Sequence, residues 1–190
     1  MTVVVELIVV DLKEGTDKEN TAFRKLREGA AKGGLKASHF EDGFELKDFS
    51  WPTDEYGDFD NELKKIAASD VTRHFLTFPS FSPAVTAAPV TETVILTLKE
   101  DADLAAFKAF QDGAISKLKE APVVHGAAYA ITTEAGANPI VVLFVGWDSA
   151  EAHQAIAAAP ESQALLGTLY AFIEKGDLVH VSYSKRPRRV

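Results

Sequence analysis

Cysteine is absent from this chain of 190 residues. Disulfide bridges, thiolate metal sites and cysteine nucleophiles are therefore excluded. Long apolar runs are missing as well, since no stretch reaches the roughly 18–20 apolar residues that a membrane helix needs. The apolar stretch Val3–Val10 contains Glu6 and has neither a basic leader nor a small-residue cleavage site, so it predicts a strand rather than a signal peptide. These absences predict a cytoplasmic protein.

Positive charge is scarce, and the net charge is −8. This balance argues against nucleic acid or an anionic membrane as the main partner, because phosphate binding needs a basic surface. The basic stretch Lys185–Arg189 is short, and we expect it to be a solvated chain end. The composition, 46% hydrophobic and 25% charged, is ordinary for a soluble globular protein with one domain or two small fused ones.

Ligand sets for cofactors are also missing from the sequence. No two histidines stand at the helical spacing of a metal site, and no glycine-rich phosphate loop or Gly-x-Ser-x-Gly nucleophile motif occurs. We therefore expect neither a metal nor another cofactor.

The run Ile140–Val145 is the feature around which the chain is organised. It is continuously apolar, rich in β-branched residues and bounded by Pro139 and Gly146, which predicts a strand. Asp148 or Ser149 is expected to cap a following helix. Since the apolar run does not alternate with polar residues, we expect both faces of the strand to be covered, by helices on one side and a second sheet on the other.

The order of predicted elements occurs twice. In the first half we expect strands at 3–10, 35–40, 44–51 and 73–78 and helices at 17–32 and 52–69. In the second half we expect strands at 92–98, 123–131, 140–147 and 178–183 and helices at 101–120, 149–159 and 161–174. The segment Phe23–Ala30 (FRKLREGA) also parallels Phe107–Ala114 (FKAFQDGA), and Trp51 parallels Trp147. Several matches in the same order indicate an internal duplication.

Each half is predicted to be a ferredoxin-like β-α-β-β-α-β repeat of class α+β. The first repeat covers residues 1–78, a Pro-rich linker covers 79–89, and the second repeat covers 90–190. Each repeat would form an antiparallel sheet with helices on one face and a bare apolar opposite face. Packing the two sheets together would bury those faces in an α/β barrel with helices outside. The chain would then be a pseudo-dimeric monomer, and further association into a homodimer is left open.

The segment Val145–His153 (VGWDSAEAH) resembles the third-strand tryptophan and following helix of the dimeric α/β-barrel superfamily. The closest resemblance is to the antibiotic-biosynthesis-monooxygenase and stress-responsive A/B-barrel families. The resemblance implies a cavity that holds a small organic molecule. Some relatives oxidise quinol-like or polyketide substrates with dioxygen and no cofactor, others cyclise or dehydrate polyketides, and some have no known chemistry.

His125 and Tyr129 are the candidate catalytic residues. They lie on one face of a predicted strand, roughly 13 Å apart, so they would flank a pocket rather than touch. The small residues around them leave room for a ligand. A histidine can remove a phenolic or α-keto proton, and a tyrosine hydroxyl can hold the resulting oxyanion. The alternative is a histidine that is bonded to the backbone at the rim of the core.

Four further residues are candidate substrate-binding residues: Trp147, His39, Trp51 and His180. Each tryptophan is also expected to close a strand end by packing. His153 is expected to be a surface or capping residue. Two functions remain open: a cofactor-free oxygenase or cyclase of an aromatic or polyketide-like molecule, and a non-catalytic ligand-binding or stress-associated barrel.

Overall fold

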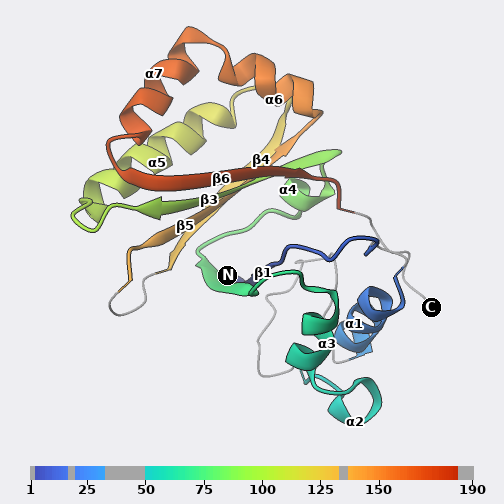
Figure 1. Cartoon of the computed structure of the whole chain (residues 1–190). Coiled ribbons are helices and arrows are strands. Elements are labelled where there is room, and N and C mark those ends of the chain that lie inside the picture. Colours follow the sequence, from blue (N-terminus) through green and yellow to red (C-terminus); the bar gives the residue numbers. More distant parts are fainter. Residues whose placement is uncertain (1–2, 17–19, 33–49, 133–136, 184–190) are drawn as a thin grey trace. The chain divides into compact units, whose positions relative to one another are not determined.

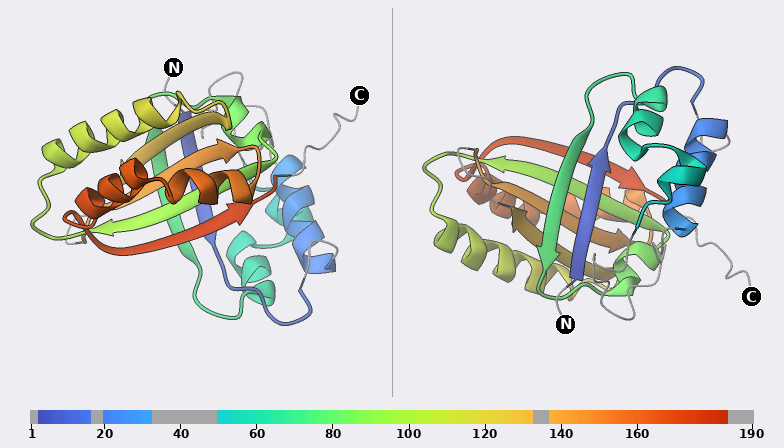
Figure 2. Two further views of the ribbon diagram at one scale, coloured as in Figure 1. Left: turned by 90° about the horizontal axis from the view of Figure 1, so that it is seen from above. Right: turned by 90° about the horizontal axis from the view of Figure 1, so that it is seen from below.

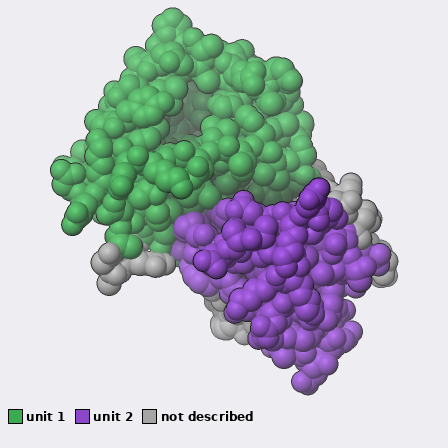
Figure 3. Space-filling model, viewed as in Figure 1, with its two compact units in different colours: residues 1–3, 76–190 green, residues 4–75 purple. Residues whose placement is uncertain are grey.

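The computed structural model describes residues 3–16, 20–32, 50–132 and 137–183. The chain divides into two compact units, shown in different colours in Figure 3. Unit 1 comprises residues 1–3 and 76–190, and unit 2 comprises residues 4–75.

Unit 1 is a four-stranded antiparallel sheet with helices on both faces. Its strands are β3 (Val90–Leu98), β4 (Val124–Thr132), β5 (Ile140–Trp147) and β6 (Ile173–Val181), in the spatial order β4-β5-β3-β6. Helices α5 (Leu104–Leu118), α6 (Ala150–Ala157) and α7 (Pro160–Leu169) lie together on one face (Figures 1 and 2). This order is the ferredoxin-like β-α-β-β-α-β arrangement, as the sequence predicted for the second half.

Local signals fix where the helices of unit 1 begin. The Asp103 carboxylate accepts hydrogen bonds from the backbone N–H groups of Ala105 and Ala106, which caps α5. The Ser149 hydroxyl accepts from Ala152 N–H, so Ser149 is the cap that the sequence predicted for α6. Pro160 occupies the first turn of α7, where its missing N–H costs no hydrogen bond.

Both faces of β5 are covered over most of the strand, as expected, but the second sheet expected on the face opposite the helices is not confirmed. Val141 and Val145 are buried towards α5, in clusters with Phe107 and Ile115. The alternate residue Phe144 is buried on the opposite face, against the rings of Phe78 and Phe81.

The segment predicted as a Pro-rich linker contains a helix instead. Helix α4 (Pro83–Ala87) begins with a Ser82 cap and with proline in its first turn. Its Val85 is fully buried, and the Val85 carbonyl accepts a hydrogen bond from the Thr91 hydroxyl at 2.8 Å. A β-carbon added to Gly146 would lie 2.8 Å from that same carbonyl oxygen, so α4 packs closely on β5. Proline here starts a helix rather than keeping a connection extended. The domain boundaries predicted at 78 and 90 stay a prediction.

Unit 2 contains α1 (Thr21–Lys32), α2 (Thr53–Tyr56), α3 (Phe59–Ile66) and most of β1 (Val3–Val9) and β2 (Thr72–Phe78). Strands β1 and β2 pair in a two-stranded sheet. The core between α1 and α3 is formed by Leu26, Leu63 and Ile66. This order agrees with the outer elements of the predicted first repeat.

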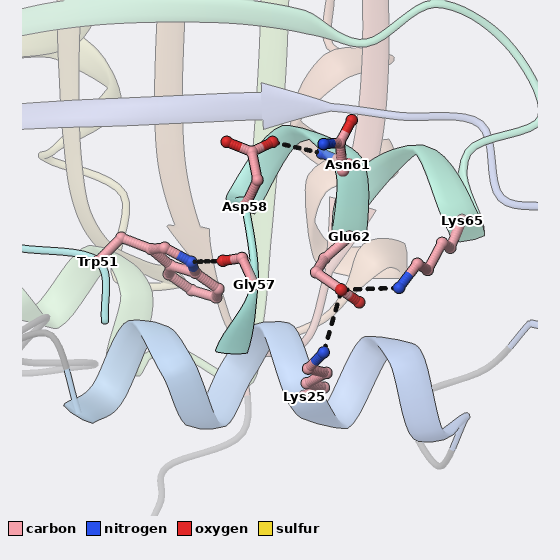
Figure 4. A network of polar contacts seen from close by, with 7 residues as sticks. All are labelled: Lys25, Trp51, Gly57, Asp58, Asn61, Glu62 and Lys65. Carbon is pink, nitrogen blue, oxygen red and sulfur yellow. Dashed lines mark hydrogen bonds and ion pairs between the residues drawn. The ribbon is translucent and has the colours of Figure 1, made fainter. Parts of the chain in front are cut away.

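A buried carboxylate joins α1 to α3 in unit 2 (Figure 4). Glu62 is 6% exposed and contacts the ammonium groups of Lys65 at 2.7 Å and Lys25 at 3.0 Å. These two ammonium groups hold the pKa of Glu62 below its ordinary value. Gly57, with a φ of 76°, lies beside this carboxylate, and a β-carbon there would be 2.9 Å from Glu62 Oε1. The Glu62–Lys25 pair therefore ties α1 to α3, and the positive φ of Gly57 favours glycine beside it.

Two parts of the predicted architecture are not settled by this fold. The predicted strands 35–40 and 44–51 fall largely on residues 33–49, outside the described residues, and Ser50 and Trp51 are described but not in a strand. The described strands form two sheets rather than one closed barrel. The tandem repeat and its closure into a barrel therefore stay predictions.

Candidate functional site

The helix-facing side of the unit 1 sheet carries residues that align across all its strands. One set, the central row, contains Tyr129, Leu143, Val94 and Leu178. The next set, the polar row, contains Ala127, Val145, Glu92 and His180. Thus a carboxylate and an imidazole stand beside an apolar row on the same face.

The central row is not fully covered by the helices. Val94 and Leu143 belong to the two inner strands but are only half-buried, and Leu178 is 47% exposed. Neither α6 nor α7 has a fully buried residue. Figure 3 shows a hollow in the surface of unit 1. Apolar side chains in the middle of the sheet are therefore partly accessible.

A chain of polar contacts runs from the buried end of the polar row to its surface. Glu92, 6% exposed, accepts a hydrogen bond from the Trp147 indole N–H at 2.8 Å. Its other oxygen lies 3.5 Å from His153 Nε2. His153 Nδ1 lies 2.9 Å from His180 Nε2, and His180 is exposed. We call Glu92, His153 and His180 the relay.

Burial shifts the two inner members of the relay towards their neutral forms. It raises the pKa of Glu92, although the hydrogen bond from Trp147 and the nearby His180 act in the opposite direction. Burial lowers the pKa of His153. The Trp147 and His153 rings also pack together, with centroids 5.0 Å apart. A carboxyl group that favours protonation beside an imidazole that favours neutrality is suited to passing a proton on.

The Glu92→Gln variant is expected to change the pH dependence of stability. Between the ordinary carboxyl pKa and the raised pKa of Glu92, the folded protein holds more protons than the unfolded chain. The free energy of unfolding should therefore fall through that window as pH rises, and Glu92→Gln should remove this fall. Urea unfolding of both proteins from about pH 4 to pH 8 measures this effect. The free energy of unfolding of the variant minus that of the parent should grow as pH rises. Glu120→Gln, at an exposed position, is the control. If the difference in free energy of unfolding between Glu92→Gln and the parent stayed constant with pH, the raised pKa of Glu92 would be contradicted.

A separate groove follows the outer edge of β4. Its volume is about 540 Å³, and it is lined by β4 residues Ala127–Ile131, by one side of α5 and by Thr77, Pro79 and Ser80. The Tyr129 hydroxyl donates a hydrogen bond to Asp112 at 2.8 Å. Burial and this carboxylate raise the pKa of Tyr129 to about 12, so the phenol stays protonated at neutral pH. Tyr129 thus lies where the groove meets the central row.

The structure does not bring His125 and Tyr129 to one pocket wall. His125 is exposed, and its Nε2 lies 2.7 Å from Asp148 Oδ1. It is not among the residues that line the groove, whereas Tyr129 is. Their pairing as catalytic residues stays a prediction.

The predicted substrate-binding residues lie in three different settings. Trp147 is fully buried and bound to Glu92, and His180 is the exposed end of the relay. Trp51 lies in unit 2, where its indole N–H donates to the Gly57 carbonyl at 2.6 Å and its ring leaves no space for a β-carbon on Gly29. His39 lies outside the described residues.

Sequence reasoning missed Glu92 and undervalued His153. The signal for Glu92 was present, because strand Val90–Leu98 puts Glu92 on the same face as Leu96 and Leu98. An acidic residue on an apolar strand face needs a partner. Glu92 has two partners, the Trp147 indole N–H at 2.8 Å and His153 at 3.5 Å. His153 is half-buried rather than the surface or capping residue that was expected.

Neither a candidate set of metal-binding side chains nor a membrane-spanning helix occurs in the part of the chain that the structure describes. There, no group of three or more histidine or acidic side chains could hold a metal ion. Among the described helices, none is long and apolar enough to cross a bilayer.

Comparisons with known proteins give a likeness over about half of the chain. No protein-family model matches it, and no curated protein matches it. Three solved structures illustrate the likeness. The first is a dimeric protein of unknown function and ferredoxin-like fold from Bacteroides fragilis, with 18% identity, covering 50% of this chain and 95% of that one, at a TM-score of 0.42. The second is SnoaB, a cofactor-independent oxygenase from Streptomyces nogalater, with 16% identity, 53% and 97% coverage and a TM-score of 0.42. The third is a dimeric ferredoxin-like protein of unknown function from Thermobifida fusca, with 17% identity, 50% and 92% coverage and a TM-score of 0.41.

At these identities and scores the likeness carries no conclusion about activity or assembly. The ferredoxin-like arrangement of unit 1 rests on its own strand order and pairing.

Proposed function

We propose that unit 1 binds a small, largely apolar organic molecule over the central row and removes a proton from it with His180. The reaction would be that of a cofactor-free oxygenase or cyclase on an aromatic or polyketide-like molecule. The observation that carries this proposal is the relay, which connects an exposed imidazole beside the central row to a buried carboxyl group.

The relay gives His180 a way to act as a base. In the tautomer that this role needs, His153 carries its proton on Nε2, 3.5 Å from the Glu92 carboxylate, and its Nδ1 accepts from His180 Nε2–H. A lone pair is then left on His180 Nδ1, which contacts no partner among the described residues. A proton taken there can pass through His153 and end on Glu92, where burial favours the neutral acid.

The central row suits a flat apolar substrate. Val94, Leu143 and Leu178 present uncharged side chains beside one another across three strands. A molecule bound on them would lie next to His180, because Leu178 and His180 are alternate residues on the same face of β6. Tyr129, protonated and at the far end of the row, is placed to donate a hydrogen bond to an oxyanion once it leaves Asp112.

Deprotonation is the first step that both reaction types share. Removal of a proton from a phenol, or from a carbon next to a carbonyl, gives an electron-rich anion. That anion can react with dioxygen in an oxygenase, or attack a carbonyl of the same molecule in a cyclase. The geometry supports the deprotonation, and the nature of the substrate would decide which second step follows.

Isotope exchange tests the proposal even where the final product is unidentified. Anthrone-like and poly-β-ketone compounds would be incubated with the protein in deuterated water, and exchange of their acidic C–H hydrogens followed by NMR, alongside oxygen uptake. We expect exchange above the buffer rate for at least one class of compound. Binding of these compounds without exchange or turnover would support the alternative, a non-catalytic ligand-binding or stress-associated barrel.

A further inference from the structure

The outer edge of β4 is an unpaired strand edge in unit 1. Strand β4 stands at the end of the strand order and pairs only with β5 among the described strands. Five consecutive residues of it, Ala127–Ile131, line the groove of about 540 Å³. A continuous stretch of strand can line a groove in this way when its free edge, with its outward N–H and C=O groups, faces the groove.

This edge lacks the features that usually block strand addition. Ala127–Ile131 contains no proline and no charged residue, and the irregularity in β4 pairing lies before it, between Val124 and Gly126. Natural sheet edges are normally protected by charges, proline or bulges. The small side chains of Ala128 and Ala130 also leave room for another backbone to approach.

The helical wall of the groove is charged in a pattern that fits an extended ligand. Lys108 and Lys119 of the α5 region both line the groove, and neither ammonium group makes an ion pair or hydrogen bond with a described residue. Eleven helical positions separate them, or roughly 16 Å. Residues i and i+4 of an extended strand lie on one face about 13–14 Å apart. Asp112 lies between the two lysines and is occupied by Tyr129.

We propose that this groove binds an extended acidic segment of a partner protein, which adds to β4 as a further strand. Acidic side chains at positions i and i+4 of the segment would lie against Lys108 and Lys119, and an uncharged residue between them would pass Asp112. Backbone hydrogen bonds to β4 would supply affinity and the lysines would select the charge pattern. The proposal does not depend on the relay, since none of its three residues lines the groove.

A capped peptide with the residue order Glu-Val-Thr-Val-Glu is the probe, added to the ¹⁵N-labelled full chain. We expect amide shifts concentrated at Ala127–Ile131. The double variant Lys108→Glu with Lys119→Glu should weaken binding at least about tenfold, because two attractions become repulsions. The double variant should instead favour a second peptide in which lysine replaces glutamate at both ends. Lys117→Glu, exposed on α5 but outside the groove, is the matched control and should change affinity less than twofold.

Backbone methylation distinguishes strand addition from simple charge attraction. Two further peptides carry N-methyl groups either on residues two and four or on residues one, three and five. One of them must lose binding about tenfold or more if the segment pairs with β4, because one alternate set of N–H groups faces the strand. Equal binding of both methylated peptides would overturn the proposal. So would an equal loss in the Lys117→Glu control, or sedimentation showing that a second copy of the chain occupies this edge and excludes the peptide.

Discussion

The His180→Asn variant is expected to lower turnover of the proposed substrate by about 10²–10⁴-fold, the usual share of general base catalysis. The side chain is exposed, so its replacement should leave the melting temperature nearly unchanged. The loss should fall on kcat rather than on KM, because the imidazole moves a proton and does not hold the apolar part of the substrate. Steady-state kinetics together with thermal melts measure both.

His125→Asn is the matched control for this experiment. His125 is also an exposed imidazole of unit 1 next to a carboxylate, but it pairs with Asp148 and stands outside the relay. We expect its turnover to stay within about threefold of the parent. If His125→Asn abolished turnover and His180→Asn did not, the sequence-based pair of His125 and Tyr129 would be the correct assignment, and the relay would be a structural contact.

The Gly146→Ala variant is expected to lower the free energy of unfolding by about 3 kcal/mol, and the melting temperature by roughly 6–12 °C. The new β-carbon would lie 2.8 Å from the Val85 carbonyl oxygen, 2.8 Å from the Ala88 β-carbon and 3.1 Å from the Val85 α-carbon. Two of these three atoms are backbone atoms of the α4 region, so relief requires α4 to move away from the sheet. Movement of α4 would also strain the hydrogen bond between Thr91 and Val85.

Gly167→Ala provides the comparison for Gly146→Ala. Gly167 lies inside α7, and a β-carbon there meets no atom within 4 Å. The variant should gain up to about 1 kcal/mol from the better helix propensity of alanine. Thermal or urea unfolding of the two variants beside the parent would separate close packing from a general effect of adding a methyl group. Similar stability in both variants would show that α4 is not packed tightly on β5.

Most of unit 1 could be predicted from the sequence, because the pattern of apolar residues and the helix-capping residues indicate the same element boundaries. The run Ile140–Val145 is flanked by Pro139 and Gly146, and Ser149 caps the next helix, so strand, end and helix follow from local chemistry. The beginning of β6 was placed wrongly. Glu174–Asp177 is polar and was assigned partly to a helix, but pairing with β3 keeps this stretch in the sheet.

The site was harder to predict because it depends on contacts between residues far apart in the sequence. His153 and His180 lie on a helix and on the last strand, and only the antiparallel register of β3 and β6 brings His180 opposite Glu92. The residue pattern within a single strand favoured His125 and Tyr129, which a regular strand would put on one face, but the pairing of β4 is irregular between Val124 and Gly126. Strand spacing could not reveal that each of them has its own carboxylate partner.

Local opening of strand β6 would interrupt the proposed proton transfer. Among the described strands it pairs with β3 alone, and nearly all of its residues are exposed. Edge strands of this kind open locally far more often than a sheet's inner strands, which is visible as fast exchange of their amide hydrogens. Each opening would carry His180 away from His153 while Glu92 and Trp147 stay bonded on the inner strands. Proton transfer would therefore proceed only during the closed intervals, and a ligand that packs on Leu178 would lengthen them.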